Sequence, residues 1–191
     1  MIPSGMLLAA YRKGFFPMAI DGEIRWFSPR ERGIIPLDGF HASRRLRRVL
    51  KQGRFEVAVD RTFEGVVAAC ASRPDADGTW IDAEIAESYA ALHRAGFAHS
   101  VETWREGELV GGLYGVTLRG AFFGESMFHR VTDASKVALA WLVERLRARG
   151  YTLLDIQWVT PHLASLGAVA VHRTRYRALL ADAMRQDCRF V

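Results

Sequence analysis

Hydrophobic and polar residues follow different periods in different parts of the chain, and these periods predict its secondary structure. Before Ser43, glycines and prolines interrupt each apolar run, so we expect a short helix over 7–12 and otherwise loops and short extended pieces. From residue 55 onward the periods are regular. In chain order they predict a strand over 55–59, helices over 61–71 and 82–94, strands over 99–104, 108–118 and 121–128, a helix over 133–149, a strand over 152–158, a helical turn over 161–166, a strand over 168–172 and a helix over 174–184.

A further helix is predicted directly after Ser43, a residue that favours the N-cap position, and it should end at Gly53. At about 100° per residue, the apolar residues of this helix fall on one face and the cations on the opposite one. The apolar face is formed by Leu46, Val49 and Leu50, and the basic face by Arg44, Arg47, Arg48 and Lys51. We therefore expect one face to pack against the protein and the other to present positive charge to solvent.

The order of the elements indicates an α+β fold. Three consecutive strands separated by the turn signals Glu106-Gly107 and Arg119-Gly120 predict an antiparallel meander, and a polar loop of the Pro-Asp-x-Asp-Gly type is expected over 73–78. A long helix then leads to another strand, which gives a mixed sheet flanked by helices. Acyl-transfer enzymes of the GNAT type have this architecture. We predict a small basic N-terminal domain over 1–54 and a GNAT-like domain over 55–191.

Positive charge is concentrated at the start of the chain. The 191 residues carry a formal net charge of +5, but residues 1–54 hold 11 Lys and Arg against 4 Asp and Glu, whereas residues 55–191 hold 15 against 17. The length allows one sizeable domain and a small second one, and the hydrophobic half of the residues is typical of a globular protein. A basic patch of this kind favours a polyanionic partner.

Cysteine and histidine positions argue against a disulfide framework and a metal site. Cys70 and Cys188 are far apart, which indicates a reducing compartment, and none of the six histidines stands at a recognised metal-ligand spacing. No apolar run approaches the ~20 residues of a membrane span, and the first residues do not form a secretory signal. We therefore expect a cytoplasmic protein with no metal and no membrane partner.

Three polar residues stand inside apolar strands and are candidates for chemistry. Glu125 must find a partner, be protonated or face a cavity, and a salt bridge to a neighbouring arginine is the structural alternative. Asp155 and Gln157 fall on one face of a strand, about 6.5–7 Å apart. Together they could bind an amine, or they could form the solvent face of an edge strand.

Other motifs narrow the chemistry. Three glycines within Gly111–Gly115 predict a bulge or a close backbone approach. The chain has no phosphate-binding glycine motif, and the segment before the helix over 133–149 lacks the pyrophosphate element of CoA users, so no CoA or other cofactor is expected. Ser126 and Ser165 lack the Gly-x-Ser-x-Gly setting of a serine hydrolase. Trp26 and Trp80 are either packing plugs or platforms on which a base can stack.

Several longer segments resemble the leucyl/phenylalanyl-tRNA–protein transferase family. The resemblance runs from about Tyr11 to the C-terminal helix, in order and at fitting intervals. Its strongest segments are 98–104 (AHSVETW), 108–116 (ELVGGLYGV) and 123–128 (FGESMF), and supporting matches are 26–30 (WFSPR), 78–81 (GTWI), 134–136 (ASK), Asp155-x-Gln157 and 162–168 (HLASLGA).

The resemblance implies an enzyme that moves Leu, Phe and, less readily, Met from aminoacyl-tRNA to the α-amine of proteins that begin with Arg or Lys, which marks them for N-end-rule degradation. It implies catalytic roles for Asp155 and Gln157, which would orient and activate the amine, and for Glu125, near the basic acceptor. Trp80 would stack near the terminal adenosine, and Ser126 would lie at the substrate. An elongated apolar pocket would be formed by Leu113, Phe122, Met127, Leu142, Leu146 and Leu154, and tRNA would bind Arg44, Arg45, Arg47, Arg48 and Lys51.

Two other classes of function stay open at this point. One is a non-catalytic tRNA- or RNA-binding module on a GNAT-like scaffold, and the other is a CoA-dependent N-acetyltransferase. The presence of Glu125, Asp155 and Gln157 together favours the transferase over the first, and the missing pyrophosphate element argues against the second. The expected partners are aminoacyl-tRNA and proteins with N-terminal Arg or Lys, bound by a monomer.

Overall fold

A mixed seven-stranded sheet runs through the protein, which is described here by a computed structural model covering residues 1–72 and 79–191. The strand order is β4-β5-β6-β7-β8-β3-β9, and all described pairings are antiparallel except the parallel pair β7 and β8. The strands are β3 (Glu31–Ile34), β4 (Glu56–Val59), β5 (Ala98–Arg105), β6 (Glu108–Leu118), β7 (Ala121–His129), β8 (Leu153–Gln157) and β9 (Val169–His172).

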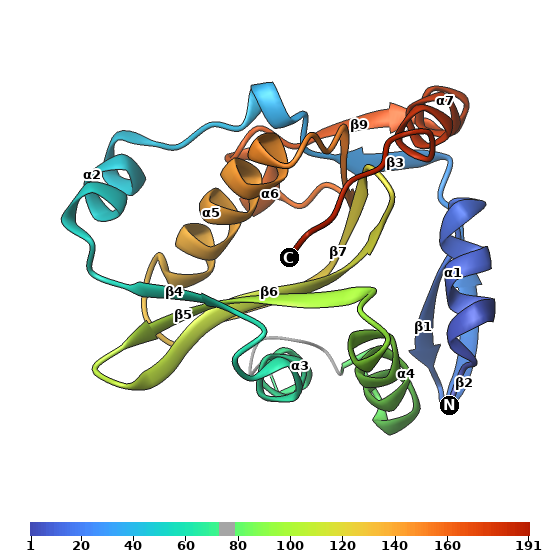
Figure 1. Cartoon of the computed structure of the whole chain (residues 1–191), viewed down its shortest axis with the longest axis horizontal. Helices are drawn as coiled ribbons and strands as arrows, with labels where there is room; N and C mark the ends of the chain where they lie inside the picture. The colour runs from blue at the N-terminus through green and yellow to red at the C-terminus, as the bar shows by residue number, and fades with distance from the viewer. Residues whose placement is uncertain (73–78) are drawn as a thin grey trace.

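Helices cover both faces of this sheet (Figure 1). The long helix α5 crosses one face above β5, β6 and β7, with α2 beside it, and α3 and α4 cover the opposite face. A separate hairpin of β1 (Phe16–Ile20) and β2 (Glu23–Phe27) stands next to α1. The helices are α1 (Ser4–Arg12), η1 (Leu37–Gly39), α2 (Arg44–Gln52), α3 (Phe63–Ala71), α4 (Ala83–Arg94), α5 (Ala134–Ala148), α6 (Pro161–Ala164) and α7 (Arg173–Ala183).

Local sequence signals explain the ends of the predicted helices. The Ser43 hydroxyl accepts a hydrogen bond from the Leu46 N–H at 3.2 Å, and Gly53 ends α2 in the left-handed conformation with φ 59°. The Asp82 carboxylate caps α4 in the same way, through the Ile85 N–H at 2.8 Å. Such caps satisfy backbone groups that a helix end leaves without partners.

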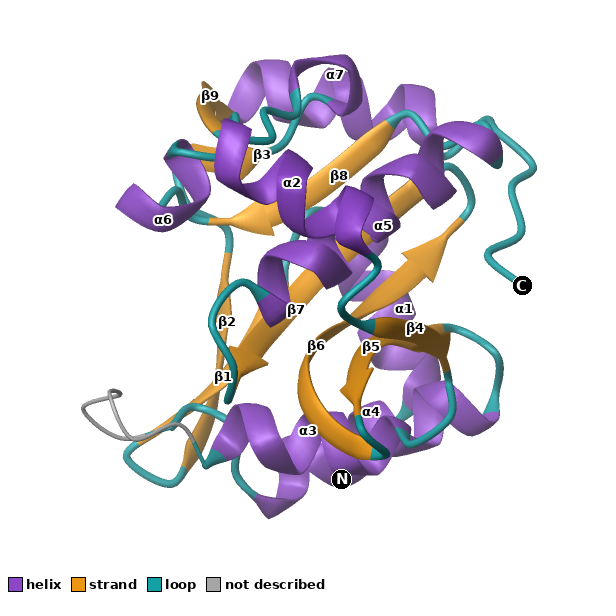
Figure 2. Ribbon diagram, turned by 90° about the vertical axis from the view of Figure 1, so that its left-hand side faces the viewer, coloured by secondary structure: helices purple, strands orange, loops and turns teal. Residues whose placement is uncertain are grey.

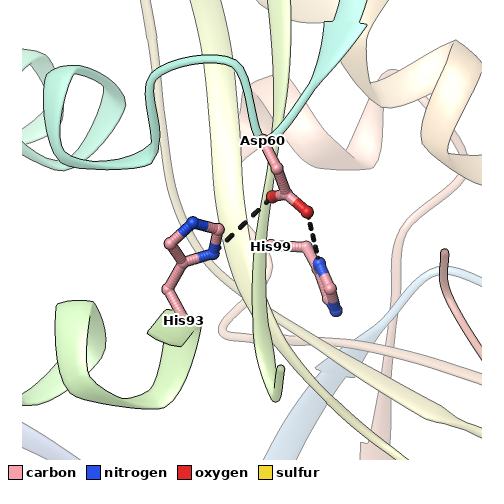
Figure 3. Close-up of side chains that lie close together, drawn as sticks. All are labelled: Asp60, His93 and His99. Carbon is pink, nitrogen blue, oxygen red and sulfur yellow. Dashed lines mark hydrogen bonds and ion pairs between the residues drawn. The ribbon is translucent and has the colours of Figure 1, made fainter. Parts of the chain in front are cut away.

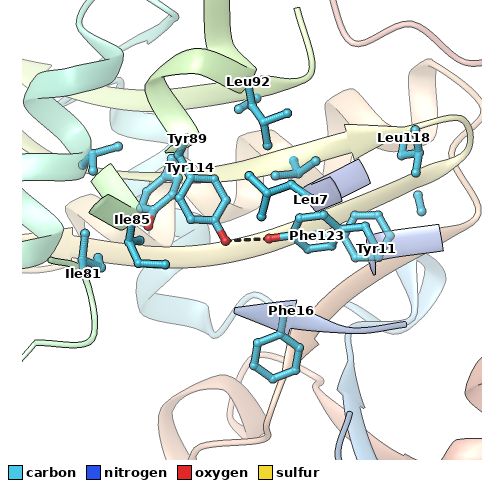
Figure 4. Close-up of a cluster of buried hydrophobic side chains, with 14 of the residues drawn as sticks. Leu7, Tyr11, Phe16, Ile81, Ile85, Tyr89, Leu92, Tyr114, Leu118 and Phe123 are labelled. Atoms are coloured by element: carbon cyan, nitrogen blue, oxygen red, sulfur yellow. Dashed lines mark hydrogen bonds between the residues drawn. The ribbon is translucent and has the colours of Figure 1, made fainter. Parts of the chain in front are cut away.

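Two apolar cores fill the space between the sheet and its helices. The core on the α3 and α4 side also includes α1, and Figure 4 shows its aromatic centre around Tyr11, Tyr89, Tyr114 and Phe123. The core on the α5 side includes residues of α2, β6, β7 and β8. The active-site candidates lie on strands that separate these two cores.

The α+β fold with a mixed sheet flanked by helices is confirmed, as is the antiparallel meander of β5, β6 and β7. From Ser43 onward, each helix and strand predicted in the described part of the chain is present, with ends that differ by two residues or fewer. The loop predicted over 73–78 lies outside the described residues. The pattern did not identify β1, β2 or β3, because these strands are short and contain Pro17, Gly33 and charged residues.

The strand order bears on the division of the chain at residue 54. Strand β3 belongs to the segment 1–54, yet it pairs with β8 on one side and β9 on the other. Residues 31–34 therefore share a sheet with residues 56–172. That residues 1–54 and 55–191 form two separate domains stays a prediction. No helix in the described ranges combines the length and apolar character needed to cross a bilayer.

Candidate active site

The parallel strands β7 and β8 pair over only three residues each and then diverge (Figure 2). The last pair is Phe123 with Asp155, and both Glu125 and Gln157 lie two residues beyond it. The crossover helix α5 joins these strands, as expected for a parallel pair. The sheet therefore opens where two of the sequence-predicted catalytic residues stand.

Each diverging strand is bulged at this place. Tyr114 of β6 pairs with Ser126 and Gly115 pairs with Gly124, so Glu125 is the extra residue on β7. On β8, the register against β3 shifts at Ile156 in the same way. Bulges interrupt the alternation of side chains and re-aim them, often beside active sites. The bulge suggested by the glycines of 111–115 is confirmed, and its consequence is the placement of Glu125.

Asp155 is fully buried and accepts four hydrogen bonds. Arg32 donates from Nε at 2.9 Å and from Nη2 at 2.7 Å, the Tyr176 hydroxyl donates at 2.6 Å, and the Gln157 backbone N–H donates at 2.9 Å. Two carboxylate oxygens offer about four lone-pair positions, so all of them are occupied. Strand β8 is an interior strand, and the alternative in which Asp155 and Gln157 form the solvent face of an edge strand is wrong.

Arg32 balances the charge of Asp155 inside the protein. Its side chain is 1% exposed, its Nη1 donates to the Gly14 carbonyl at 3.2 Å, and its guanidinium lies between the rings of Phe16 and Tyr176, 4.5 and 4.7 Å from their centroids. Burial acts to lower the pKa of Arg32, but the Asp155 carboxylate outweighs it and raises that pKa. The guanidinium is therefore held by the carboxylate, by a backbone carbonyl and by two aromatic rings.

Glu125 has tyrosines as partners instead of an arginine. Tyr11 donates to one carboxylate oxygen at 2.7 Å and Tyr89 to the other at 3.0 Å, and the two phenol oxygens are 2.6 Å apart. None of the described arginines forms a salt bridge with Glu125, so the structural alternative is wrong. Burial raises the pKa of Glu125 to about 7, although both phenols and the Arg32 charge oppose this rise. Near neutral pH the carboxyl group is thus divided between its protonated and ionised forms.

Gln157 is strained and has an unsatisfied side chain. Its φ is 57°, in the left-handed region that non-glycine residues seldom adopt, and its side chain is 7% exposed. The amide nitrogen Nε2 is buried with no hydrogen-bond partner among the described residues. Across the pairing with β3 stands Gly33, where an added Cβ would lie 2.7 Å from the Trp158 carbonyl carbon. Buried donors without a partner and strained backbone positions are both rare, and both are more frequent at functional sites than elsewhere.

The residues predicted for the amino-acid pocket belong to one core, the one on the α5 side. Met127 is half-buried there, and the other five, Leu113, Phe122, Leu142, Leu146 and Leu154, are buried. Ser126 is half-buried on β7, opposite Tyr114. Trp80 packs against the other core, and its carbonyl accepts a hydrogen bond from the Ala19 N–H at 3.1 Å. The structure thus places the predicted pocket and the predicted adenosine platform on opposite sides of the sheet.

The predicted tRNA-binding residues divide into two groups on α2. Arg45 forms a salt bridge with Asp133, and the Arg45 Nε lies 3.0 Å from the Asp133 carboxylate. The basic face of Arg44, Arg47, Arg48 and Lys51 is exposed, and none of the four has an acidic partner within the described residues. Leu50 is 39% exposed, so the prediction that it packs is wrong, whereas Leu46 and Val49 are buried as predicted.

Asp60, His93 and His99 form the one group of potential metal ligands in the described part of the chain (Figure 3). Hydrogen bonds account for it. His99 Nδ1 lies 2.6 Å from the Asp60 carboxylate, which also accepts the Ser100 N–H, and His93 Nδ1 lies 2.8 Å from the Ala98 carbonyl. A carbonyl only accepts, so this nitrogen of His93 bears a hydrogen and cannot bind a metal. The expectation of no metal stays a prediction.

Sequence reasoning missed Arg32, Tyr11, Tyr89 and Tyr176. A tyrosine in an apolar stretch of sequence is usually interpreted as a core residue, and all three tyrosines are indeed buried. Arg32 lies in a four-residue strand whose partner strands begin more than 100 residues later, so no local pattern predicts its burial. One available signal was the cost of burying Asp155 and Glu125, which requires partners of this kind elsewhere in the chain.

The site therefore offers two buried carboxyl groups, one held by an arginine and one by tyrosines, and a carboxamide whose buried nitrogen has no partner among the described residues. Groups of this kind can position and polarise reacting molecules in a group-transfer reaction.

Comparisons with known proteins identify the family. The model "Leucyl/phenylalanyl-tRNA protein transferase" matches residues 34–181, and the model of its N-terminal domain matches residues 2–30. The protein of that name from Novosphingobium aromaticivorans is 55% identical over 96% of this chain and 72% of its own length, and that from Ruegeria sp. is 52% identical over 100% and 90%. The chain belongs to the leucyl/phenylalanyl-tRNA–protein transferase family and is a transferase enzyme.

Solved structures resemble this fold more distantly. L-PGS from Bacillus licheniformis is 16% identical, with a TM-score of 0.44 over 81% of this chain and 53% of that chain. A GCN5-related N-acetyltransferase-like protein from Streptococcus suis is 15% identical, with a TM-score of 0.41 over 88% and 64%.

Proposed function

We propose that this protein moves Leu, Phe and, less readily, Met from aminoacyl-tRNA to the α-amine of proteins that begin with Arg or Lys, and so marks them for N-end-rule degradation. The observation that carries the proposal is Gln157, whose buried amide nitrogen lacks a partner among the described residues and which, like Glu125, stands two residues beyond the last pair of β7 and β8. Family membership supplies the class of reaction, and the names of the related proteins supply the tRNA and the protein acceptor.

The reaction needs little chemical assistance from the protein. The lone pair of the neutral α-amine attacks the ester carbonyl, a C–N bond forms, the ester C–O bond breaks, and the proton lost by the amine reaches the departing ribose oxygen. The ester is already activated, so the enzyme has to align the reactants and stabilise the developing oxyanion. In the proposed complex the Gln157 amide oxygen accepts a hydrogen bond from the amine, and its nitrogen donates to the carbonyl oxygen.

The two carboxyl groups have different roles in this proposal. Asp155 has four donors and no free lone pair, so it is a positioning residue that fixes the backbone of Gln157. Glu125 receives the cationic side chain of an N-terminal Arg or Lys when it is ionised. The apolar core of Leu113, Phe122, Met127, Leu142, Leu146 and Leu154 bounds the pocket for the Leu or Phe side chain, with Ser126 beside it. Trp80 stacks on the terminal adenosine from the other side of the sheet, so the aminoacyl group reaches its pocket where β7 and β8 diverge.

The proposed activity is tested by incubating the protein with labelled Leu-tRNA and a peptide that begins with Arg, then with the same peptide carrying an acetylated N-terminus. Label should enter the free peptide only. A folded protein that transfers no label would overturn the proposal, and label in both peptides would place the acceptor elsewhere than the α-amine.

Replacing Gln157 with alanine is expected to lower kcat for transfer about 100-fold, the loss typical of one preorganised donor at a reacting oxygen. The affinity for uncharged tRNA should stay unchanged, because the amide contacts the reacting atoms and not the tRNA body. Single-turnover transfer and a filter-binding titration measure the two quantities. Equal losses in both would contradict the assignment.

Replacing Arg44, Arg47 and Arg48 with Gln is expected to weaken tRNA binding and to reduce the slope of log affinity against log salt by about 2 to 3, because each phosphate contact contributes about 0.9. A matched control replaces Arg94, Arg105 and Arg119, which are exposed but already paired with acids. An equal change of slope in the control would show that net charge alone governs binding.

A further inference from the structure

A groove of about 480 Å³ lies between α2 and α5, above β4, outside the residues of the candidate active site. Its aromatic walls are Phe40, Phe55 and Trp141, and the exposed Leu50 of α2 stands at its edge. The volume lies in the range of roughly 300–1,000 Å³ that is usual for small-molecule sites. The groove is thus large enough for one planar ring system and leaves apolar surface in contact with solvent.

Positive charge surrounds this aromatic groove. Arg47 and Arg54 line it and have no acidic partner in the described part of the chain, and Arg47 also belongs to the basic face of α2. The groove's acidic residue, Glu144, is paired with Arg147, another lining residue. The unpaired charges at the groove are therefore cationic, which disfavours the cationic peptide substrate as its occupant and favours an anion.

We propose that the groove binds one unstacked nucleotide of the tRNA body, with the base against Phe40, Phe55 and Trp141 and the adjoining phosphate on Arg47 and Arg54. Unpaired RNA bases are recognised by aromatic side chains and arginine together, since each base presents a π-face and each nucleotide carries a phosphate. This site rests on the proposed use of aminoacyl-tRNA and adds a base contact to it. The basic face of α2 continues the path for the backbone on either side.

Stacking and charge contribute differently to salt dependence, and this difference provides the test. Replacing Trp141 with Leu should weaken binding of uncharged tRNA about tenfold, within the range for one lost base stack, at each salt concentration and without changing the slope. Trp141→Phe should restore most of the affinity. Replacing Arg47 and Arg54 with Gln should reduce the slope by about 2.

The matched control is Trp104→Leu, on the other face of the sheet. Trp104 is half-buried and donates to Glu102, whose carboxylate also accepts the Thr62 N–H at the start of α3. This variant should bind tRNA as the wild type does. Ultraviolet crosslinking of the unmodified protein to tRNA should join a nucleotide to a peptide containing Phe55 or Trp141, and this readout does not depend on the folding of any variant.

The outcomes separate the groove from the proposed activity. Three results would each overturn the proposal: a wild-type affinity for tRNA in Trp141→Leu, an equal loss of tRNA affinity in Trp104→Leu, or crosslinks confined to peptides outside the groove. The groove would then be free to serve another partner, such as a protein. Absence of transfer by the wild type would remove the proposed activity, whereas the binding and crosslinking results would still decide the groove. At saturating aminoacyl-tRNA, Trp141→Leu should keep the wild-type kcat, because only tRNA affinity is affected.

Discussion

Replacing Asp155 with alanine is expected to lower the free energy of unfolding by about 3–5 kcal/mol, the usual cost of removing one partner of a buried ion pair. The substitution leaves Arg32, which is 1% exposed, without its counter-charge, and it removes the acceptor of the Tyr176 hydroxyl and of the Gln157 N–H. Transfer should be lost as well, because Gln157 is no longer held in its strained conformation. Urea unfolding measures the first effect and single-turnover transfer the second.

A double replacement separates stability from catalysis in this prediction. Changing Arg32 to Met and Asp155 to Leu together removes both charges, and replacing a buried pair by apolar residues of similar size is often neutral for stability. The double variant should therefore recover the part of the unfolding free energy that the unpaired Arg32 charge costs, but not the part lost at the Tyr176 hydroxyl and the Gln157 N–H, and it should still fail to transfer. Its affinity for uncharged tRNA should match that of the wild type, which shows that the folded surface is intact.

An exposed ion pair provides the control for the size of this effect. Asp187 lies 3.3 Å from Arg119 at the surface, and its replacement by alanine should change stability by less than about 1 kcal/mol. If Asp155→Ala were no more destabilising than Asp187→Ala, Arg32 would have to find another partner or leave the interior. That result would contradict the charge balance on which the positioning role of Asp155 rests.

The fold could be predicted from the sequence wherever local pattern decides structure. Capping residues such as Ser43 and Asp82 and the turns of the meander have short-range physical effects, so they mark element ends directly. Strand β3 has no such signal, because it is short and gains its stability from pairing with β8 and β9, far along the chain. Without β3, strand β8 looked like an edge strand.

The candidate site could be predicted only in part, for the same reason. Polar residues inside apolar strands pointed to Glu125, Asp155 and Gln157, and the resemblance supplied their chemistry. Their partners come from α1, β3, α4 and α7, and the alternation of a regular strand does not anticipate the bulge that places Glu125. Such long-range contacts become visible only when the chain is folded.

A second large effect is expected from the titration of Glu125. Burial raises its pKa from 4.5 to about 7 in the folded protein, whereas the unfolded chain exposes the group to water. Below pH 4.5 the carboxyl group is protonated in both states, and its favourable contribution is fully present. As the pH rises to about 7, the unfolded state releases its proton first, so the free energy of unfolding falls by about 3 kcal/mol in total.

Glu125→Gln isolates this contribution because it keeps the shape of the side chain and removes its titration. The wild type should lose about 3 kcal/mol more stability than the variant between pH 4.5 and pH 8, as measured by urea unfolding at each pH. The control variant Glu56→Gln changes an exposed residue that is paired with Arg61, and it should lose as much stability over this pH range as the wild type does. Identical pH dependence in the wild type and Glu125→Gln would show that the group is not protonated inside the folded protein.

The same titration should appear in the rate of transfer to a peptide that begins with Arg. The peptide α-amine must be neutral to attack, and its pKa is about 7.7–8.0, while Glu125 must be ionised to hold the cationic side chain. Below pH 6.5 both ionisations limit the rate, so log kcat/KM should rise by about two per pH unit in the wild type and by about one in Glu125→Gln. A slope of one in both proteins would mean that the charge of Glu125 does not take part in binding the acceptor, and its tyrosine partners would then serve the fold alone.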